Sequence, residues 1–216
     1  MRIKVALLLL CGFVSLSTFA HGPGAIPLVP PNEGGDLWTP LQLGIWPVQL
    51  FDPLTSIYGL NSNLLLAIQD KEVYGISVAP FHVCGDDVAG ITIGLDSIIE
   101  GDHSGILISL VSGVGNNYGI QAGVLNVCKD NHYGHAHGHC GGLQIGLVNV
   151  SDAPGVQIGL YNHSNAPEDS DWQRWRQIQV QVGLFNHSNA PGLQIGVVNH
   201  NSNASVEWLP LVNFLF

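Results

Sequence analysis

The densest group of metal-binding side chains in this sequence lies between residues 132 and 140. Four imidazoles and one thiol fall within nine residues, at His132, His135, His137, His139 and Cys140. Imidazole and thiolate are ligands for Zn²⁺, Cu²⁺ and Ni²⁺, and the intervening Gly and Ala residues would let them converge on one ion. No second spaced cluster completes a defined site, so the alternative is an exposed polar loop that picks up metal adventitiously.

Two cysteines flank this histidine-rich segment. Cys128 precedes it and Cys140 closes it, and each follows or precedes a strand-like stretch. In an oxidising compartment they could form a disulfide worth about 3 kcal/mol in the chain-entropy model. That disulfide would compete with Cys140 as a metal ligand. Cys84 is then the unpaired cysteine, either buried and inert or an alternative partner.

A second polar segment, residues 168–176, combines two Trp, two Arg and three acids. Trp and Arg favour protein contacts, but the same residues also suit an aromatic anchor at a membrane interface, and we favour the anchor. Carboxylates near strand ends lack a spacing that defines a Ca²⁺ or acid/base site; they are Asp86, Asp87, Asp96, Glu100 and Asp102. No nucleophile elbow, phosphate loop or zinc-protease motif is present, which predicts a protein without enzymatic activity.

The elements that must position these segments are copies of one eight-residue repeat. It reads Gly-Leu-Gln-Ile-Gly-Leu-Val-Asn at residues 142–149 and recurs from 155, 179 and 192, with weaker copies from 75, 90, 105 and 119. The second, fourth and sixth positions are apolar in 23 of 24 cases, and the fifth is always small. Alternation with a period of two predicts a β-strand with one apolar face and one polar, small-residue face.

The spacing between repeats separates two arrangements of these strands. Successive copies start 15, 15, 14, 23, 13, 24 and 13 residues apart. A parallel coil must travel out and back within one repeat, whereas an antiparallel hairpin needs only a turn. The spacing therefore favours an antiparallel meander that closes into a barrel of about 10–12 strands, with apolar columns facing lipid and Gln, Gly and Ser facing the lumen. The alternative is a soluble β-solenoid or barrel with Leu, Ile and Val inside.

Composition and the N-terminus point to export. Only 10% of residues are charged, against about 25% in a typical soluble domain, so part of the surface is expected to face something other than water. Residues 1–20 resemble a signal peptide, residues 21–37 are a Gly/Pro-rich lead-in, and residues 38–216 form a single β domain. Removing the signal leaves 4 basic and 16 acidic residues, a charge of −12, which argues against nucleic acid as a partner.

Two stretches resemble known bacterial proteins. Alternate residues from Val206 to Phe216 are mostly apolar and end in an aromatic ring, which resembles the terminal strand of outer-membrane barrels, although Pro210 departs from it. The repeat and the Leu209–Phe214 segment resemble a family of short-repeat bacterial surface proteins over roughly residues 75–216. The resemblance implies a location rather than an activity.

These observations predict an exported outer-membrane or cell-surface β-barrel repeat protein, structural or weakly pore-forming, in contact with outer-membrane lipid. The alternative is a soluble periplasmic or secreted β-repeat protein that binds a partner or a metal through residues 132–140. Partner contacts are expected through residues 129–140 and 166–178. The sequence names no small-molecule ligand and no cofactor beyond Zn, Cu or Ni at the histidine-rich segment.

Overall fold

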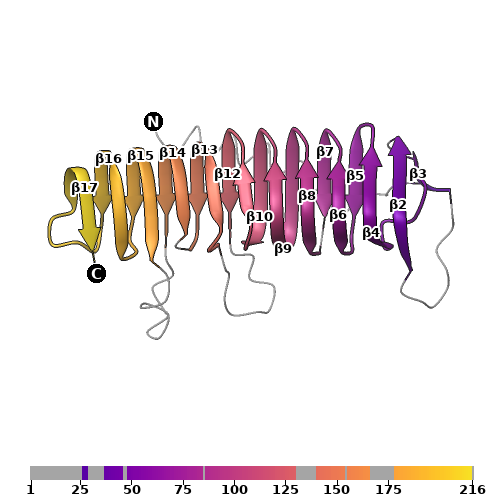
Figure 1. Ribbon diagram of the computed structural model, residues 1–216, viewed down its shortest axis with the longest axis horizontal. Helices are drawn as coiled ribbons and strands as arrows, with labels where there is room; N and C mark the ends of the chain where they lie inside the picture. The colour runs from indigo at the N-terminus through magenta and orange to yellow at the C-terminus, as the bar shows by residue number, and fades with distance from the viewer. Residues whose placement is uncertain are drawn as a thin grey trace.

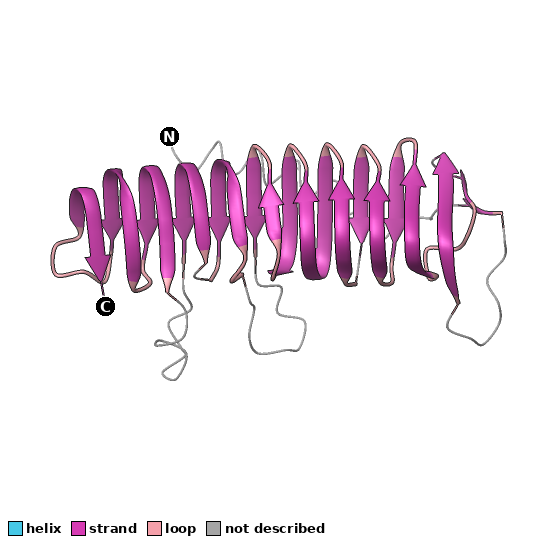
Figure 2. Cartoon of the chain, in the orientation of Figure 1, coloured by secondary structure: helices cyan, strands magenta, loops and turns pink. Residues whose placement is uncertain are grey.

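A computed structural model describes residues 26–28, 37–45, 48–84, 86–129, 140–153, 155–165 and 178–215. The segment 1–20, in which we predict a signal peptide, lies outside these residues. Within them the structure is all-β and contains no helix (Figure 2). The strands are β1 (Ile26–Pro27), β2 (Trp38–Ile45), β3 (Val48–Gln49), β4 (Ser56–Asn63), β5 (Leu66–Gln69), β6 (Val73–Val78), β7 (Phe81–Cys84), β8 (Val88–Ile93), β9 (Asp96–Ile108), β10 (Val111–Asn117), β11 (Ile120–Ala122), β12 (Leu125–Cys128), β13 (Leu143–Ser151), β14 (Val156–Ser164), β15 (Gln179–Ser188), β16 (Gly192–Asn201) and β17 (Trp208–Leu215).

The strands wind into a β-solenoid of about nine turns, and the prediction of an antiparallel barrel is wrong (Figure 1). Successive repeats pair in parallel and in identical register, so that Gln144 lies beside Gln157 and Asn149 beside Asn162. The same register continues from β14 to β15 and from β15 to β16. Antiparallel pairing occurs only between β16 and β17 and between β2 and β3 within the described residues. The alternative prediction of a solenoid is the one the structure supports.

A corner inside each repeat explains how 13 residues complete a coil. In β13 the pairing to β14 covers 143–146 and 148–151 but skips Leu147, where the chain changes direction. One coil therefore contains a four-residue segment, a one-residue corner and a second four-residue segment, and four residues connect it to the next coil. The repeat is not a single strand, as the alternation had implied, but two short segments on opposite sheets. Each repeat therefore contains both the outgoing and the returning segment of its coil, and no further residues are needed for a return strand.

The amide face of the C-terminal repeats points inward and the aliphatic face points outward, as in the barrel prediction. The solenoid alternative placed the aliphatic residues inside. Gln144 and Asn149 are at most 2% exposed, whereas Ile145 and Leu147 are 41% and 50% exposed. In the C-terminal coils the interior thus holds the amide columns, and the aliphatic columns lie outside. For these coils the expectation that Leu, Ile and Val would fill the inside of a solenoid is wrong, because the amides satisfy one another there.

Two ladders of amide side chains run through the C-terminal coils. Gln157 Nε2 donates to Gln144 Oε1 of the preceding coil at 2.8 Å, and also to a backbone carbonyl across the interior at 3.1 Å. Asn149 Nδ2 donates to Asn162 Oδ1 of the following coil at 2.8 Å. The Gln ladder therefore donates towards the N-terminus and the Asn ladder towards the C-terminus. Buried polar groups cost little when each donor and acceptor is satisfied in this way.

The N-terminal coils have a different interior. Leu107 stands where the later coils have Gln, and Ile99 and Val114 lie where they have Ser. Backbones also stack closely here: Gly75, Gly90 and Gly105 are in register, each with φ between 131° and 141°. A Cβ on Gly90 would overlap the Gly75 carbonyl oxygen, so this column requires glycine both for its positive φ and for the close approach.

An antiparallel strand covers the C-terminal end of the solenoid. Within the described residues β17 pairs with β16 alone. Pro210 lies at a register shift between Leu209 and Leu211, and Leu211 has a positive φ of 66°. Proline lacks a donor and a bulge bends the strand, so both features interrupt the free edge of β17. The segment that resembles a barrel's terminal strand is thus an end cap in this fold.

Candidate functional site

The most extended candidate surface is an apolar edge that follows the corners of the coils. The side chains at the corners are between 44% and 57% exposed and lie one above another along the solenoid axis. We call this surface, with the aliphatic columns on either side of it, the apolar edge. Its corner residues are Leu95, Leu110, Val124, Leu147, Leu160, Leu184 and Val197.

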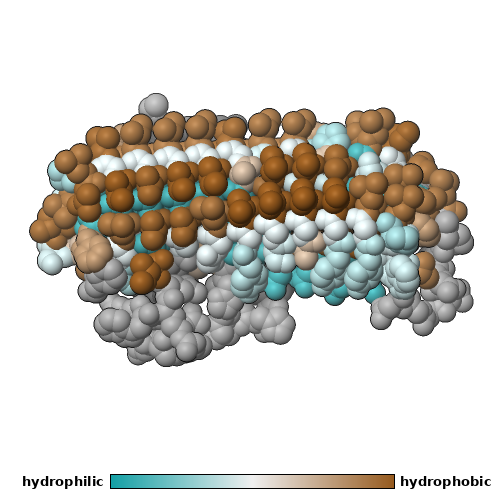
Figure 3. Space-filling view, in the orientation of Figure 1, coloured by the Kyte–Doolittle hydropathy of each residue, from teal (hydrophilic) through white to brown (hydrophobic). Residues whose placement is uncertain are grey.

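The columns that flank the corners are apolar as well. On one sheet they include Ile91, Ile106, Ile145 and Ile158, each 39–42% exposed. On the other sheet Phe185 is 53% exposed. Figure 3 shows the result as continuous apolar rows along the length of the molecule. Monomeric soluble proteins rarely expose apolar patches of this extent, and such patches mark sites of contact with protein or membrane.

Aromatic rings border the apolar edge on both sheets. On one sheet Trp38 meets Tyr58 edge-to-face with ring centroids 6.2 Å apart, and Tyr58 stacks on Tyr74 at 5.2 Å. On the other sheet a stack of histidines ends at Trp208. Rings with an apolar body and a polar tip are the side chains that favour the boundary between hydrocarbon and water.

Charged residues gather on the opposite edge, where the turns between coils lie. Most of the described acids are here: Asp52, Asp70, Glu72, Asp86, Asp87, Glu100, Asp102, Asp152 and Glu207. We call this surface the acidic edge. Both sequence insertions leave from it, because β12 and β14 end there at Cys128 and Ser164. Hydrophilic residues accordingly gather along one margin of the molecule in Figure 3.

Asp96 is the exception among the described acids. It begins β9 beside the corner residue Leu95, in register with Phe81 and Val111. Burial raises the pKa of its carboxyl, opposed by a hydrogen bond from the Ser97 backbone, and Oδ1 finds no hydrogen-bond partner among the described residues. A carboxyl whose neutral form is favoured disturbs an apolar surface less than an ordinary aspartate does.

The histidine-rich segment predicted as a metal site is only partly described. His132, His135, His137 and His139 lie outside the described residues, as do residues 166–177 of the second insertion. The structure pairs Cys128 with Cys140 in a disulfide with a Cα–Cα distance of 5.8 Å. The sulfur of Cys140 is therefore held in the disulfide and does not serve as a metal ligand. Cys84 is a free, buried thiol, and burial raises its pKa to about 12.

Sequence reasoning missed a second histidine cluster, formed by His163, His187 and His200. These residues follow the last Asn of three successive repeats, and strand register places them side by side. Their rings stack with centroid separations of 4.7 and 4.6 Å. The signal was present as the recurring Asn-His pair at 162–163, 186–187 and 199–200. Only parallel pairing in register brings the three together.

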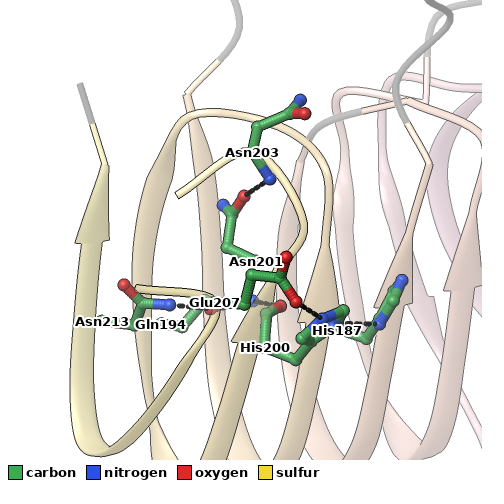
Figure 4. A network of polar contacts seen from close by, with 7 residues as sticks. All are labelled: His187, Gln194, His200, Asn201, Asn203, Glu207 and Asn213. Carbon is green, nitrogen blue, oxygen red and sulfur yellow. Dashed lines mark hydrogen bonds and ion pairs between the residues drawn. The ribbon is translucent and has the colours of Figure 1, made fainter. Parts of the chain in front are cut away.

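The ring nitrogens of this histidine column make specific contacts (Figure 4). His187 Nδ1 and His200 Nδ1 are 2.7 Å apart, and His200 Nε2 lies 3.8 Å from Glu207 Oε2. Burial, together with the charges of His163 and His200, lowers the pKa of His187 to about 4. His187 therefore stays neutral at pH 7.

No group of three or more His, Cys, Asp or Glu is arranged to hold a metal ion in the part of the chain that the structure describes. In the same part, no helix is long and apolar enough to cross a membrane. Comparison of the chain with protein-family models, with curated proteins and with solved structures finds no match. The resemblance to short-repeat surface proteins stays a prediction.

Proposed function

We propose that this protein is an exported, non-enzymatic surface protein that lies on a lipid bilayer through its apolar edge. The observation that carries the proposal is the segregation of the outer wall into an apolar edge and an acidic edge along the whole solenoid. The N-terminal segment that resembles a signal peptide and the low content of charged residues support export and a partly non-aqueous environment.

The order of residues around one coil supports a lipid surface as the occupant. In the coils that carry outward aromatic or histidine side chains, these lie between the aliphatic corner and the acidic turn. In the coil of β14, Leu160 is at the corner, Tyr161 and His163 follow, and Asp152 lies in the turn. This order matches the gradient from acyl chains to headgroups to water.

Charge favours zwitterionic over anionic lipid. The mature chain carries a formal charge of −12, and Lys71 and Lys129 both lie on the acidic edge, away from the corners. The described residues form no basic patch, so they offer no electrostatic attraction to anionic headgroups. Binding would then rest on burial of apolar area and depend little on ionic strength.

Flotation with vesicles of phosphatidylcholine and phosphatidylethanolamine tests the proposal. We expect the disulfide-bonded chain from residue 21 to float with the vesicles at both low and high salt. A variant with Leu147→Lys, Leu160→Lys and Leu184→Lys places three charges on the corners and should remain at the bottom of the gradient. A central Lys in hydrocarbon costs roughly 3 kcal/mol per residue.

The matched control adds the same charge to the acidic edge. Asn165→Lys, Ser202→Lys and Ser205→Lys replace exposed residues there, and this variant should float like the wild type. Wild-type protein that stays unbound, or corner variants that float normally, would overturn the proposal. A stable oligomer in solution that loses its association with the corner variant would also overturn it, since a second copy would then cover the edge.

A second function is favoured by the common origin of the two insertions. Both leave the acidic edge, and the two coils of β13 and β14 lie between them in the chain. If the apolar edge lies on lipid, residues 129–140 and 166–178 start on the far side of the solenoid, where a partner could reach them. Deleting residues 167–176 should abolish contact with such a partner while vesicle flotation is retained.

A further inference from the structure

We infer that His187 and His200 form an open, two-histidine site for a divalent transition-metal ion such as Zn²⁺ or Cu²⁺, distinct from the histidine-rich segment at 132–140. The site lies on the outer wall of the last coils, beside the β17 cap (Figure 4). It does not depend on the proposed lipid contact.

The convergence of two ring nitrogens carries the inference. The ring centroids of His187 and His200 are 4.6 Å apart, but a tilt of 33° brings their Nδ1 atoms to 2.7 Å. At this distance one nitrogen must donate to the lone pair of the other, so a single proton holds the pair together. When the donating ring changes tautomer and carries its proton on Nε2 instead of Nδ1, both Nδ1 lone pairs become available and a metal ion can accept them.

The geometry needed for a metal is a small adjustment from the one observed. Metal–nitrogen bonds of about 2.0–2.1 Å at a tetrahedral angle place two ligand nitrogens roughly 3.3 Å apart. A change in ring tilt on neighbouring strands can open 2.7 Å to that value. The remaining coordination positions would be filled by water, as in open metal sites.

Glu207 supplies the outer contact that metal-binding histidines usually have. Its Oε2 lies 3.8 Å from His200 Nε2, on the ring nitrogen that does not face His187. A carboxylate in this position fixes the ring orientation and raises the basicity of the other nitrogen. Glu207 is 59% exposed, so it is free to close the distance when His200 Nε2 carries the proton.

Protons compete weakly with a metal for His187. Burial and the neighbouring imidazoles lower the pKa of its ring to about 4, so the ring is neutral at pH 7. His163 differs. Its Nδ1 is buried without a hydrogen-bond partner among the described residues and does not converge on a second nitrogen. His163 therefore provides a control within the same column.

The experiment uses the full mature chain with its disulfide intact and with the five histidines outside the described residues changed to Asn: His21, His132, His135, His137 and His139. Calorimetric titration with Zn²⁺ should give one equivalent per chain. Electron paramagnetic resonance with Cu²⁺ should show two coordinating nitrogens. His187→Val and His200→Val should each lower Zn²⁺ affinity at least tenfold, and Glu207→Gln by about tenfold.

Valine is a conservative replacement, because Val127 and Val150 occupy the same outward column in the two preceding coils. His163→Val should leave the Zn²⁺ affinity within about threefold of the background. Unfolding midpoints without metal check that each variant is folded. The inference is overturned if the background chain shows no saturable binding, if His200→Val binds as before, or if His163→Val costs as much as His187→Val.

Discussion

The C-terminal coils and the N-terminal coils present similar outer walls but hold different interiors. From β13 to β16 the inner columns are Gln and Asn ladders in which each amide is hydrogen-bonded to the next coil. From β6 to β10 the inner columns combine Ile, Leu and Val with Ser, Thr and His, and several of these polar side chains find no hydrogen-bond partner within the described part of the chain. Hydrogen bonds between amide side chains stabilise the C-terminal half, and apolar packing with close backbone contact stabilises the N-terminal half.

The difference shows what a regular repeat contributes. An amide ladder works only when the same residue recurs at the same position in every coil, because each donor needs the acceptor of its neighbour. The copies that start at 119 and later keep Gln at position three and Asn at position eight, and the copies from 75, 90 and 105 do not. Where the repeat has diverged, the interior can accept apolar residues instead.

The largest expected effect is at the glycine column of the N-terminal coils. Gly90→Ala forces a β-carbon into the Gly75 carbonyl oxygen at a φ of 134°. The backbone conformation alone costs roughly 3 kcal/mol, and the overlap adds to it. Urea unfolding should show this loss, whereas Gly141→Ala, with no atom within 4 Å, should match the wild type. Equal stabilities of the two variants would show that close backbone stacking is not essential here.

The next effect is a break in the C-terminal Gln ladder. Gln157→Met keeps the length of the side chain but leaves Gln144 Oε1 without its donor and removes one of the two acceptors of Gln181 Nε2. Each buried group left unsatisfied costs about 1–3 kcal/mol, so we expect a loss of roughly 3 kcal/mol in the free energy of unfolding. A loss below about 1 kcal/mol would contradict the role given to the ladder.

A pH dependence should separate the two interiors through His82. Burial lowers the pKa of His82 from 6.5 to about 4 in the folded chain, and both ring nitrogens lack partners among the described residues. The unfolded chain binds more protons between these values, so stability falls as the pH drops from 6.5 towards 4, by up to roughly 3 kcal/mol.

The measurement is the urea midpoint at several pH values for wild type and His82→Ser. Serine is present in the same inner column at Ser97 and Ser112, so the replacement fits. The variant should lose less stability than the wild type between neutral pH and pH 4, since the other titrating groups are common to both. Parallel pH profiles would exclude His82 as the source.

The smallest effect is expected from Thr92→Val, which changes in the N-terminal half the same inner column that Gln157→Met changes in the C-terminal half. Thr92 lies in the same inner column as Gln157, but its hydroxyl has no partner among the described residues. Thr92→Val replaces the unsatisfied hydroxyl by a methyl group of similar shape, so the free energy of unfolding should be unchanged or higher by up to about 1 kcal/mol. A loss comparable to that of Gln157→Met would mean that the two interiors are stabilised alike.

Much of the local structure could be predicted from the repeat. The alternation identified the β-structure of the described repeats, and the small fifth position is indeed a site of close contact, as at Gly159. The pairing direction could not be predicted. A period of two is the same for parallel and antiparallel strands, and the corner at Leu147 has no distinct signature, because an aliphatic residue suits a strand as well as a corner.

Some features of the candidate sites could also be predicted from the sequence, and others depend on the tertiary structure. The chain's own pattern identified the apolar columns, the shortage of charge and the two cysteines around the histidine-rich segment. It did not identify the column of His163, His187 and His200, since residues 24 and 13 positions apart come together only through register. The convergence of two Nδ1 atoms depends on ring tilt, which no spacing encodes.

The sequence by itself determined that the chain is a β-repeat protein with one aliphatic face and one amide face, because side-chain alternation follows directly from strand geometry. The tertiary structure decided that the strands coil in parallel and that the amides face inward. That choice depends on cooperation between coils: one buried Gln would be unfavourable, but a column of them, each hydrogen-bonded to the next, leaves its aliphatic neighbours on the surface.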